Sequence, residues 1–179
     1  MSQCAVAPEE AAFRALMARF ATGVAVITSC GDNGPAGMTA NAFASLSLDP
    51  LLVMIGFELQ SRTLVAVRQS STFAVNVLAS DQEQISRIFA GKQPEPEKFA
   101  DCAYAERAGV PVIDGALAWL RCDLEAIHPG GDHVIVVGNV VEMGGNGGEP
   151  LLFYGGRYHR LGQDGADRFP GPRPERLAR

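Results

Sequence analysis

The side chains best suited to chemistry lie in one stretch, residues 37–57 (GMTANAFASLSLDPLLVMIGF), whose first half is polar and whose second half is apolar. In an extended segment alternate residues share a face, which would bring four polar side chains to one surface: Thr39, Asn41, Ser45 and Ser47. Asparagine offers both a donor and an acceptor, and this suits the edge of a ring with alternating carbonyl and N–H groups. The same residue types also build turns. Spacing alone therefore leaves a ligand site and a turn-capping role equally open.

A second polar group, Ser61-Arg62-Thr63, follows the apolar strand. A serine hydroxyl, a helix N-terminus and a guanidinium group are all suited to binding phosphate. The alternative is an ordinary helix N-cap at Ser61. His133 is a third candidate, at the start of the strand in GGDHVIVVGNVVE. A lone histidine in such a place is more often a surface or core residue than a catalyst, so the pattern alone gives it no role.

The common enzyme signatures do not occur in the sequence. There is no G-x-G-x-x-G after a strand, no Walker A loop, no G-x-S-x-G and no H-E-x-x-H. The four cysteines form no C-x-x-C pair and no zinc-type spacing, and only three histidines are present. We therefore expect reduced thiols and no metal site.

Composition bounds the class of protein. The 179 residues are 47% apolar and 20% charged, which fits one globular domain with its own core. A formal charge of -5 and the absence of a basic block argue against binding nucleic acid or an anionic membrane. Glu9, Glu10 and Arg14 stand where a signal peptide would need an apolar core, and no apolar run reaches the ~18 residues of a membrane span. We expect a soluble cytoplasmic protein.

The elements that must position these residues are mainly strands. Apolar periodicity and capping signals predict helices over residues 9–20 and 61–69 and, from a capping box at 80–83, up to about residue 91. Strands are predicted at 23–29, 51–57, 72–78, 119–127 and 133–142, with a last one near 151–154 or 158–161. The turns CGDNGP and HPGGD predict tight hairpins. Because strands outnumber helices and are joined by hairpins, we predict a mainly β fold, an antiparallel barrel with peripheral helices.

Three segments are predicted to stand outside this framework. KQPEPEKF, residues 92–99, combines two prolines with alternating charge and is expected to be a solvated loop rather than a lid. Residues 1–8 are expected to form a flexible N-terminus, and residues 163–179 a tail that is disordered or draped over a partner. The domain itself is expected to span residues 9–162.

Six sequence blocks, in their order, resemble the flavin reductase-like family, the short-chain NAD(P)H:flavin oxidoreductases that act as reductase components of two-component monooxygenases. The blocks are FRALMARFATGVAVITS, GMTANAFASLSLDPLLVMIGF, FAVNVLA, RIFAGK, GGDHVIVVGNVVE and PLLFYGGRYHRL. The resemblance covers roughly residues 10–162. It implies an antiparallel split β-barrel, usually a homodimer, with flavin at or near the subunit interface.

The resemblance also implies an activity and a site. A hydride would pass from NADH or NADPH to FMN or FAD, either held or exchanged, and reduced flavin would reach a partner monooxygenase by diffusion. His133 would lie near the nicotinamide as the catalytic candidate. Arg62, Lys92 and Arg157 are candidate clamps for the 2'-phosphate of NADPH, and equally ordinary surface charges. The cofactor-binding residues implied are Thr39, Ala40, Asn41, Ala42, Ser45 and Ser47 around the ring and ribityl chain, and Ser61 and Arg62 near the phosphate.

This reading also accounts for the lack of a strong catalytic constellation. The flavin carries the redox chemistry, while the protein stacks the nicotinamide on it and supplies donors for the charge that develops near N1 and the C2 carbonyl. The alternatives are a flavin- or heme-binding split barrel without activity, a relative of the pyridoxamine phosphate oxidases, and a structural dimer with an empty pocket. A binding module could dispense with His133, and a structural dimer would purify colourless.

Overall fold

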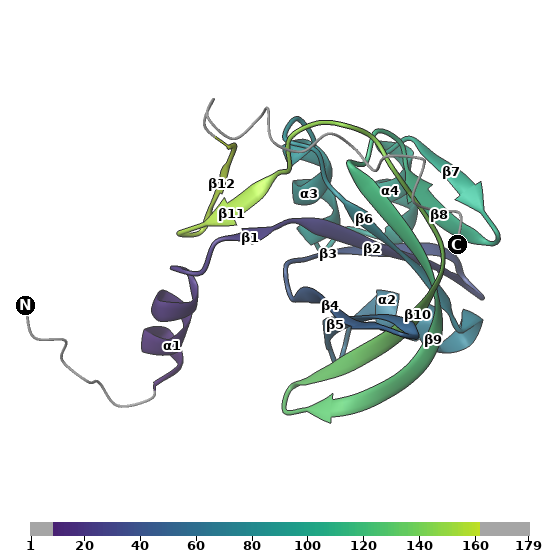
Figure 1. Cartoon of the computed structure of the whole chain (residues 1–179), viewed down its shortest axis with the longest axis horizontal. Helices are drawn as coiled ribbons and strands as arrows, with labels where there is room; N and C mark the ends of the chain where they lie inside the picture. Colours follow the sequence, from purple (N-terminus) through teal and green to yellow (C-terminus); the bar gives the residue numbers. More distant parts are fainter. Residues whose placement is uncertain (1–8, 162–179) are drawn as a thin grey trace, which may run out of the picture.

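The fold is built around one seven-stranded antiparallel sheet, shown in Figure 1. The computed structural model describes residues 9–161, so the expected flexible segments 1–8 and 163–179 lie outside the described residues. The strand order in this sheet is β3-β2-β6-β9-β10-β5-β4. In that order the strands are Gly34–Ala40, Ala25–Gly31, Thr72–Val77, Ala118–Gly130, His133–Gly145, Leu51–Glu58 and Phe43–Leu48.

Tight turns set the register of this sheet. The hairpin between β2 and β3 closes with Gly31 opposite Gly34, and the long β9–β10 hairpin closes with Gly130 opposite His133. Gly131 in that second turn has φ 76°, a left-handed conformation that glycine adopts without steric cost. The two edge strands, β3 and β4, are consecutive in the chain and are joined only by Asn41 and Ala42.

The first of three core clusters is built by the seven-stranded sheet and one helix. Its fully buried side chains come from five strands and one helix, and they include Ile27, Ile55, Phe57, Leu64, Val67 and Phe73. α2, which spans Arg62–Ser70, contributes Leu64 and Val67 to this cluster. The helix begins directly after β5, because Ser61 accepts a hydrogen bond from the main-chain N–H of Leu64 and caps the first turn.

Two further helices and two small sheets cover the remaining side. α3 spans Glu83–Ala90 and α4 spans Glu95–Ala100. The rings of Phe89 and Phe99 on these helices pack edge to face, with their centroids 5.0 Å apart. β7 and β8, residues Tyr104–Arg107 and Val110–Ile113, form a separate hairpin. β1, β11 and β12, residues Thr22–Gly23, Leu152–Tyr154 and Arg157–His159, form a three-stranded sheet.

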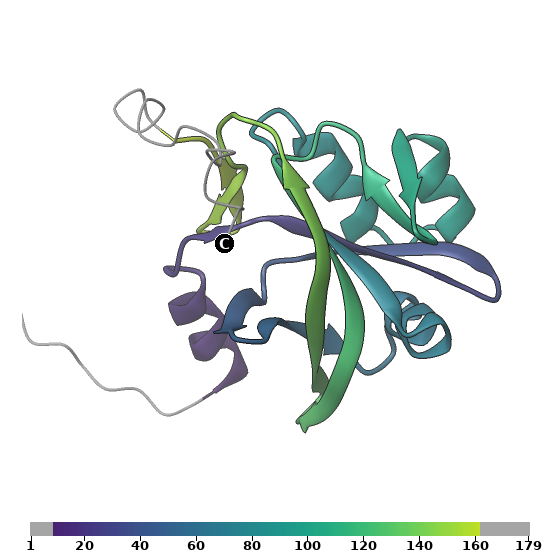
Figure 2. The same cartoon turned by 45° about the vertical axis from the view of Figure 1, so that its right-hand side comes forward.

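α1, Glu10–Met17, stands apart from the rest of the chain in both views (Figures 1 and 2). None of its residues is buried, although its sequence is amphipathic. Phe13, Leu16 and Met17 remain more than half exposed, and so does Phe20 just beyond the helix, at 69%. An apolar stripe of this kind normally packs on another surface.

Most predicted elements occur, and the antiparallel, mainly β class is confirmed. Both alternatives for the last strand are correct, since β11 and β12 pair with each other. The prediction of a solvated loop at residues 92–99 is wrong: that segment contains the start of α4, in which Lys98 and Phe99 are buried. The capping box at Ser80 is also wrong. α3 starts after Gln82, and the Gln82 side chain accepts from Ala79 N–H and donates to the Asp114 carbonyl instead.

No helix among residues 9–161 combines the length and the apolar character that crossing a membrane requires.

Candidate functional site

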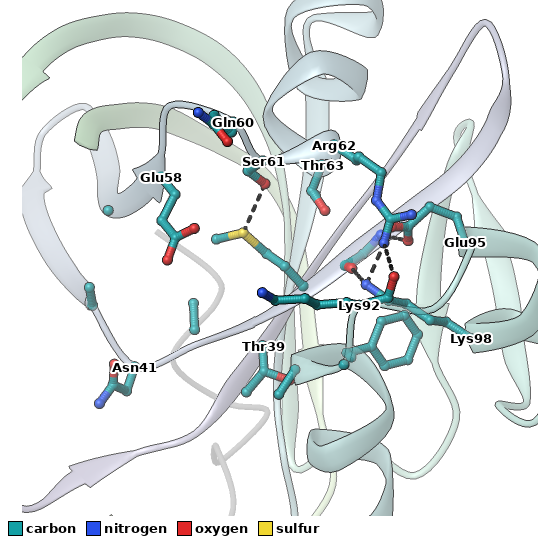
Figure 3. Close-up of a pocket in the computed structure, with 18 of the residues that line it drawn as sticks. Thr39, Asn41, Glu58, Gln60, Ser61, Arg62, Thr63, Lys92, Glu95 and Lys98 are labelled. Atoms are coloured by element: carbon teal, nitrogen blue, oxygen red, sulfur yellow. Dashed lines mark hydrogen bonds and ion pairs between the residues drawn. The ribbon is translucent and has the colours of Figure 1, made fainter. Parts of the chain in front are cut away.

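The main pocket has a volume of about 590 Å³ and is lined by residues of six elements, β3, β5, α2, α3, α4 and β10. The end of β3 and the Asn41-Ala42 link form one side, and the first turn of α2 faces them (Figure 3). The C-terminal end of α3 and the start of α4 complete the wall. His133 reaches the rim because β10 pairs antiparallel with β5, with His133 opposite Glu58. The topology thus gathers residues almost a hundred positions apart in the sequence.

Most of the residues selected from the sequence line this pocket: Thr39, Ala40, Asn41, Ala42, Ser61, Arg62 and His133. Ser45 and Ser47 do not. The chain bends at Asn41-Ala42, so β4 pairs with β5 on the far side of the link, and the pairing is irregular between the two serines. The Ser47 hydroxyl accepts a hydrogen bond from the main-chain N–H of Asp49. The single polar face expected from residue alternation is therefore interrupted, and a cofactor contact for these two serines stays a prediction.

Thr39 and Ser61 have structural hydrogen bonds of their own. The Thr39 hydroxyl donates to the Ser86 carbonyl at 2.6 Å, which ties β3 to α3. The Ser61 hydroxyl caps α2 and lies 3.3 Å from the sulfur of Met38. Both residues therefore offer mainly main-chain groups to a ligand. The first turn of α2 lines the pocket, and its N–H groups are the ones that the helix itself leaves without partners.

A partly buried charge cluster forms the wall at α4, and it was not predicted from the sequence. Glu95 accepts from the main-chain N–H of Gly37 at 2.9 Å, from Arg62 Nε at 3.0 Å and from Lys98 Nζ at 3.3 Å. Lys98 is only 3% exposed and also donates to the Gly37 carbonyl at 3.0 Å. Both main-chain groups of Gly37 are therefore held by α4, and the strand edge that borders the pocket is fixed in place.

Position 37 has no room for a side chain, so it requires glycine. A Cβ built there would lie 2.6 Å from the ring of Phe89, closer than any real contact of this kind. The i, i+3 spacing of Glu95 and Lys98 is the local feature nearest to this wall, but it does not indicate the contacts of Glu95 with Gly37 and Arg62.

His133 stands at the open end of the pocket. Its Nδ1 lies 2.7 Å from Asp132 Oδ1. The hydrogen bond from His133, followed by its charge, lowers the pKa of the exposed Asp132 carboxyl from its ordinary value. The carboxylate in turn orients the imidazole ring, which is about half exposed. His133 thus presents an oriented ring to any ligand that enters from solvent.

A second, mostly apolar cavity of about 320 Å³ adjoins the first and shares Ala40 and Asn41 with it. It is lined by residues 20–25 at the base of α1, together with Phe43 and Val77. The Thr22 hydroxyl there is buried and has no hydrogen-bond partner among the described residues. The two cavities therefore lie next to each other at Ala40 and Asn41, the second on the side of α1.

Within residues 9–161 no three His, Cys, Asp or Glu side chains gather in a group that would hold a metal ion. Burial raises the pKa of the Cys102 thiol to about 11 and that of Cys122 to about 12. Both are packed into the interior away from the pocket lining.

Comparison with known proteins finds a family model, the flavin reductase like domain, that matches residues 17–162. The chain is 40% identical over 157 residues to an NADH-dependent flavin reductase of a Rhodococcus species, covering 86% of this chain and 88% of the relative. It is 41% identical over 151 residues to the reductase component of 4-hydroxyphenylacetate 3-monooxygenase of Thermus thermophilus, covering 84% and 95%.

Solved structures agree. The Streptomyces globisporus C-1027 NADH:FAD oxidoreductase SgcE6, in complex with NAD and FAD fragments, matches with a TM-score of 0.84 at 36% identity, over 91% of this chain and 99% of that one. Nitrilotriacetate monooxygenase component B from Mycobacterium thermoresistibile matches with a TM-score of 0.83 at 34% identity, over 94% of each chain.

Proposed function

This chain belongs to the flavin reductase-like family, and from that premise we propose that it is an NAD(P)H:flavin oxidoreductase. It transfers a hydride from NADH or NADPH to FMN or FAD and supplies the reduced flavin to a partner monooxygenase. Relatives at 38% to 40% identity are named as NADH-dependent flavin, FMN or FAD reductases and as monooxygenase reductase subunits. The observation that carries the proposal is the gathering of residues 39–42, Ser61, Arg62 and His133 around one pocket.

The residues of the pocket fit a flavin nucleotide. Its volume of about 590 Å³, extended by the neighbouring cavity, lies in the range of cofactor sites. The exposed Asn41 amide and the main chain around it offer both donors and acceptors, as the polar edge of the isoalloxazine ring requires. The first turn of α2 offers N–H groups to a phosphate. We therefore assign the ring to the Asn41 end and the phosphate to the α2 end.

The bound flavin supplies the redox chemistry, because its ring accepts the hydride. The residues of this chain bind and orient. The main chain of residues 39–42 and the Asn41 amide hold the ring edge and supply donors where negative charge develops. His133, oriented by Asp132, borders the approach of the nicotinamide. Because no acid-base triad is needed, we expect loss of His133 to slow turnover without abolishing it.

We further propose that the working form is a homodimer. The support is the exposed apolar stripe formed by Phe13, Leu16 and Met17 of α1 and by Phe20 just beyond it, which lies beside the second cavity and has no buried residue in the helix. Leu46, Leu48 and Leu51 of the β4–β5 hairpin are also exposed and offer a matching apolar surface. A second copy that packs α1 against such a surface would cover both and close the open end of the flavin site.

Three smaller proposals complete this account. The seven-stranded sheet would be the split barrel of the family, because its edge strands β3 and β4 are joined by only two residues. The protein would work in the cytoplasm. Reduced flavin would leave by diffusion, and a persistent co-eluting complex with an oxygenase would count against that step. The relatives do not favour the alternative of a flavin- or heme-binding protein without activity.

An anaerobic stopped-flow experiment tests the proposed activity. Purified protein is mixed with FMN or FAD and with NADH or NADPH, and flavin bleaching is followed together with nicotinamide loss. Coupled loss well above the protein-free control is the expected result, and it also identifies the preferred pair. Flavin that binds but stays oxidised with either nicotinamide would leave a binding module and would overturn the proposal.

A further inference from the structure

Three cations line the main pocket, and the structure gives them different roles. Lys98 is buried and is bound to Glu95 and to the Gly37 carbonyl. Arg62 is bound to the same carboxylate. Lys92, by contrast, is exposed and makes no ion pair within residues 9–161. Glu95 pairs with both Arg62 and Lys98, so Lys92 is the one of these three cations that no carboxylate engages among the described residues.

Arg62 holds the segment that carries Lys92. Its Nη2 donates to the Gln93 carbonyl at 2.7 Å and approaches the Lys92 carbonyl at 3.5 Å. The Gln93 side chain donates in turn to the Ile88 carbonyl at the end of α3. The turn between α3 and α4 is therefore fixed from both sides. In Figure 3 the Lys92 side chain extends from this turn into the pocket, with its ammonium group directed away from Glu95.

Arg62 is poorly placed to act as the main anion ligand. Its Nε is bound to the mostly buried Glu95 carboxylate and its Nη2 to the Gln93 carbonyl, so a phosphate could use only the donors that these contacts leave free. A phosphate that broke these contacts would lose a charge-assisted hydrogen bond, which costs free energy. The exposed Lys92 ammonium group makes no ion pair among the described residues, although Glu58 also lines the pocket, so a phosphate that binds Lys92 breaks no such contact.

We propose that Lys92 is the cation that binds the phosphate ester of the nucleotide in this pocket, and that Arg62 is a positioning residue that holds the Lys92 turn. The inference rests on the proposed function, since it names the ligand group that meets Lys92. The phosphate comes either from the flavin, where FMN and FAD share the ribityl 5'-phosphate, or from the nicotinamide dinucleotide. The flavin is favoured because the first turn of α2 faces the same pocket.

Equilibrium binding of riboflavin and FMN to the full chain tests this, by quenching of flavin fluorescence without any turnover. Riboflavin has the ring and ribityl chain of FMN but no phosphate. Lys92→Met is expected to raise the Kd of FMN about tenfold, the worth of one charged hydrogen bond, and to leave that of riboflavin unchanged. Lys92→Arg should restore most of the FMN affinity. Arg68→Met, on the exposed side of the same helix as Arg62, is the matched control and should change neither.

Steady-state kinetics distinguish the two phosphate sources. If Lys92→Met leaves FMN binding intact but raises the KM of NADH or NADPH with kcat unchanged, Lys92 still binds a phosphate, and the nicotinamide nucleotide provides it. If FMN and riboflavin weaken equally, or neither ligand is affected, the proposal is wrong. Failure of the proposed function looks different, because wild-type protein would then reduce neither flavin with either nicotinamide.

A double-mutant cycle tests the positioning role of Arg62. Arg62→Met should also lower the preference for FMN over riboflavin, because the Lys92 turn loses its anchor. In the Lys92→Met background the same change should have no further effect on that preference, since the cation it positions is gone. Additive losses would instead show that Arg62 binds the phosphate independently, and would overturn the positioning role.

Discussion

The two ends of the pocket are built in opposite ways. At the α4 end, Glu95 joins Arg62, Lys98 and the Gly37 main chain in a cluster in which Lys98 is almost fully buried. At the other end, Asn41 and Ala42 are exposed, and His133 stands on a hairpin turn beside an exposed Asp132. One end is complete in a single chain. The other lies open beside the bare apolar stripe of α1, and we take it to be completed by a second copy and by the substrates.

The difference suggests how affinity and exchange are divided. Under the proposed function, the preformed charged end would bind the phosphate group, which changes little during the reaction, at little cost in ordering. The open end would admit and release a nicotinamide without a large conformational change. Substitutions that disrupt one end or the other are expected to have the following effects, from the largest to the smallest.

The largest effect is expected from a charge placed in the stripe of α1. Leu16→Asp puts a carboxylate into the proposed dimer interface, where desolvation costs about 3 kcal/mol, or roughly a hundredfold in dimer Kd. Ala15→Asp adds the same charge on the opposite face of the helix and should leave the dimer intact. Sedimentation velocity measures both. A wild-type protein that sediments as a monomer at micromolar concentration would contradict the interface.

Removal of the carboxylate at the closed end comes next. Glu95→Ala leaves Lys98 buried with only a carbonyl partner, and it should lower the free energy of unfolding by about 3 kcal/mol. Glu97→Ala removes an exposed carboxylate from the same turn of α4 and serves as the control for helix-dipole effects. Urea unfolding measures the free energy of unfolding of both variants, and the difference between them is the contribution of the cluster. Equal losses in the two variants would show that the cluster adds no stability.

The open end should tolerate substitution with a smaller effect on activity. His133→Ala is expected to lower kcat/KM for NADH about tenfold, the worth of one oriented contact, while the Kd of the flavin stays unchanged. Steady-state kinetics and flavin titration separate the two quantities. A parallel loss of flavin affinity would move His133 from the nicotinamide side to the flavin itself.

The smallest effect concerns the carboxylate behind His133. The hydrogen bond from His133 holds the pKa of Asp132 below its ordinary value of 3.8. A lowered pKa means that this contact is fully present above the ordinary value and is lost as the pH falls through the lowered one. In His133→Ala the carboxyl pKa should rise toward 3.8, which a carbon-13 NMR titration would detect. The same pKa in both proteins would mean that Asp132 does not orient the ring.

The parts of the fold that were predictable from sequence depend on local signals. The β9–β10 hairpin follows from its paired glycines, and α2 follows from the Ser61 cap, both of which act within a few residues. α4 was missed because prolines and alternating charges look solvated, while Lys98 is buried against Gly37, far away in the sequence, and Phe99 packs on Phe89 of the preceding helix. The β7–β8 hairpin turns at Ala108 and Gly109, both of which have positive φ. Alanine is not a typical residue for that conformation, so the sequence gives no clear sign of a turn here.

The site divides in the same way. Residues 39–42 were found because their types and their family pattern are contiguous, whereas Ser45 and Ser47 were grouped with them by an alternation that the bend at Asn41 interrupts. Glu95 carries no local mark of its role, because its partners come from β3 and α2. Tertiary contacts of this kind set the positions of Arg62 and Lys92. The periodicity of the sequence does not reveal such contacts.

The most direct test of the two-ended site is a crystal structure of the protein with oxidised FMN. The account predicts a flavin phosphate within hydrogen-bonding distance of the first turn of α2 and of Lys92, with Arg62 still paired to Glu95. The ring should lie along Asn41 and Ala42, with one face open toward His133. A phosphate at the His133 end, or an Arg62 drawn away from Glu95 to bind it, would contradict the account.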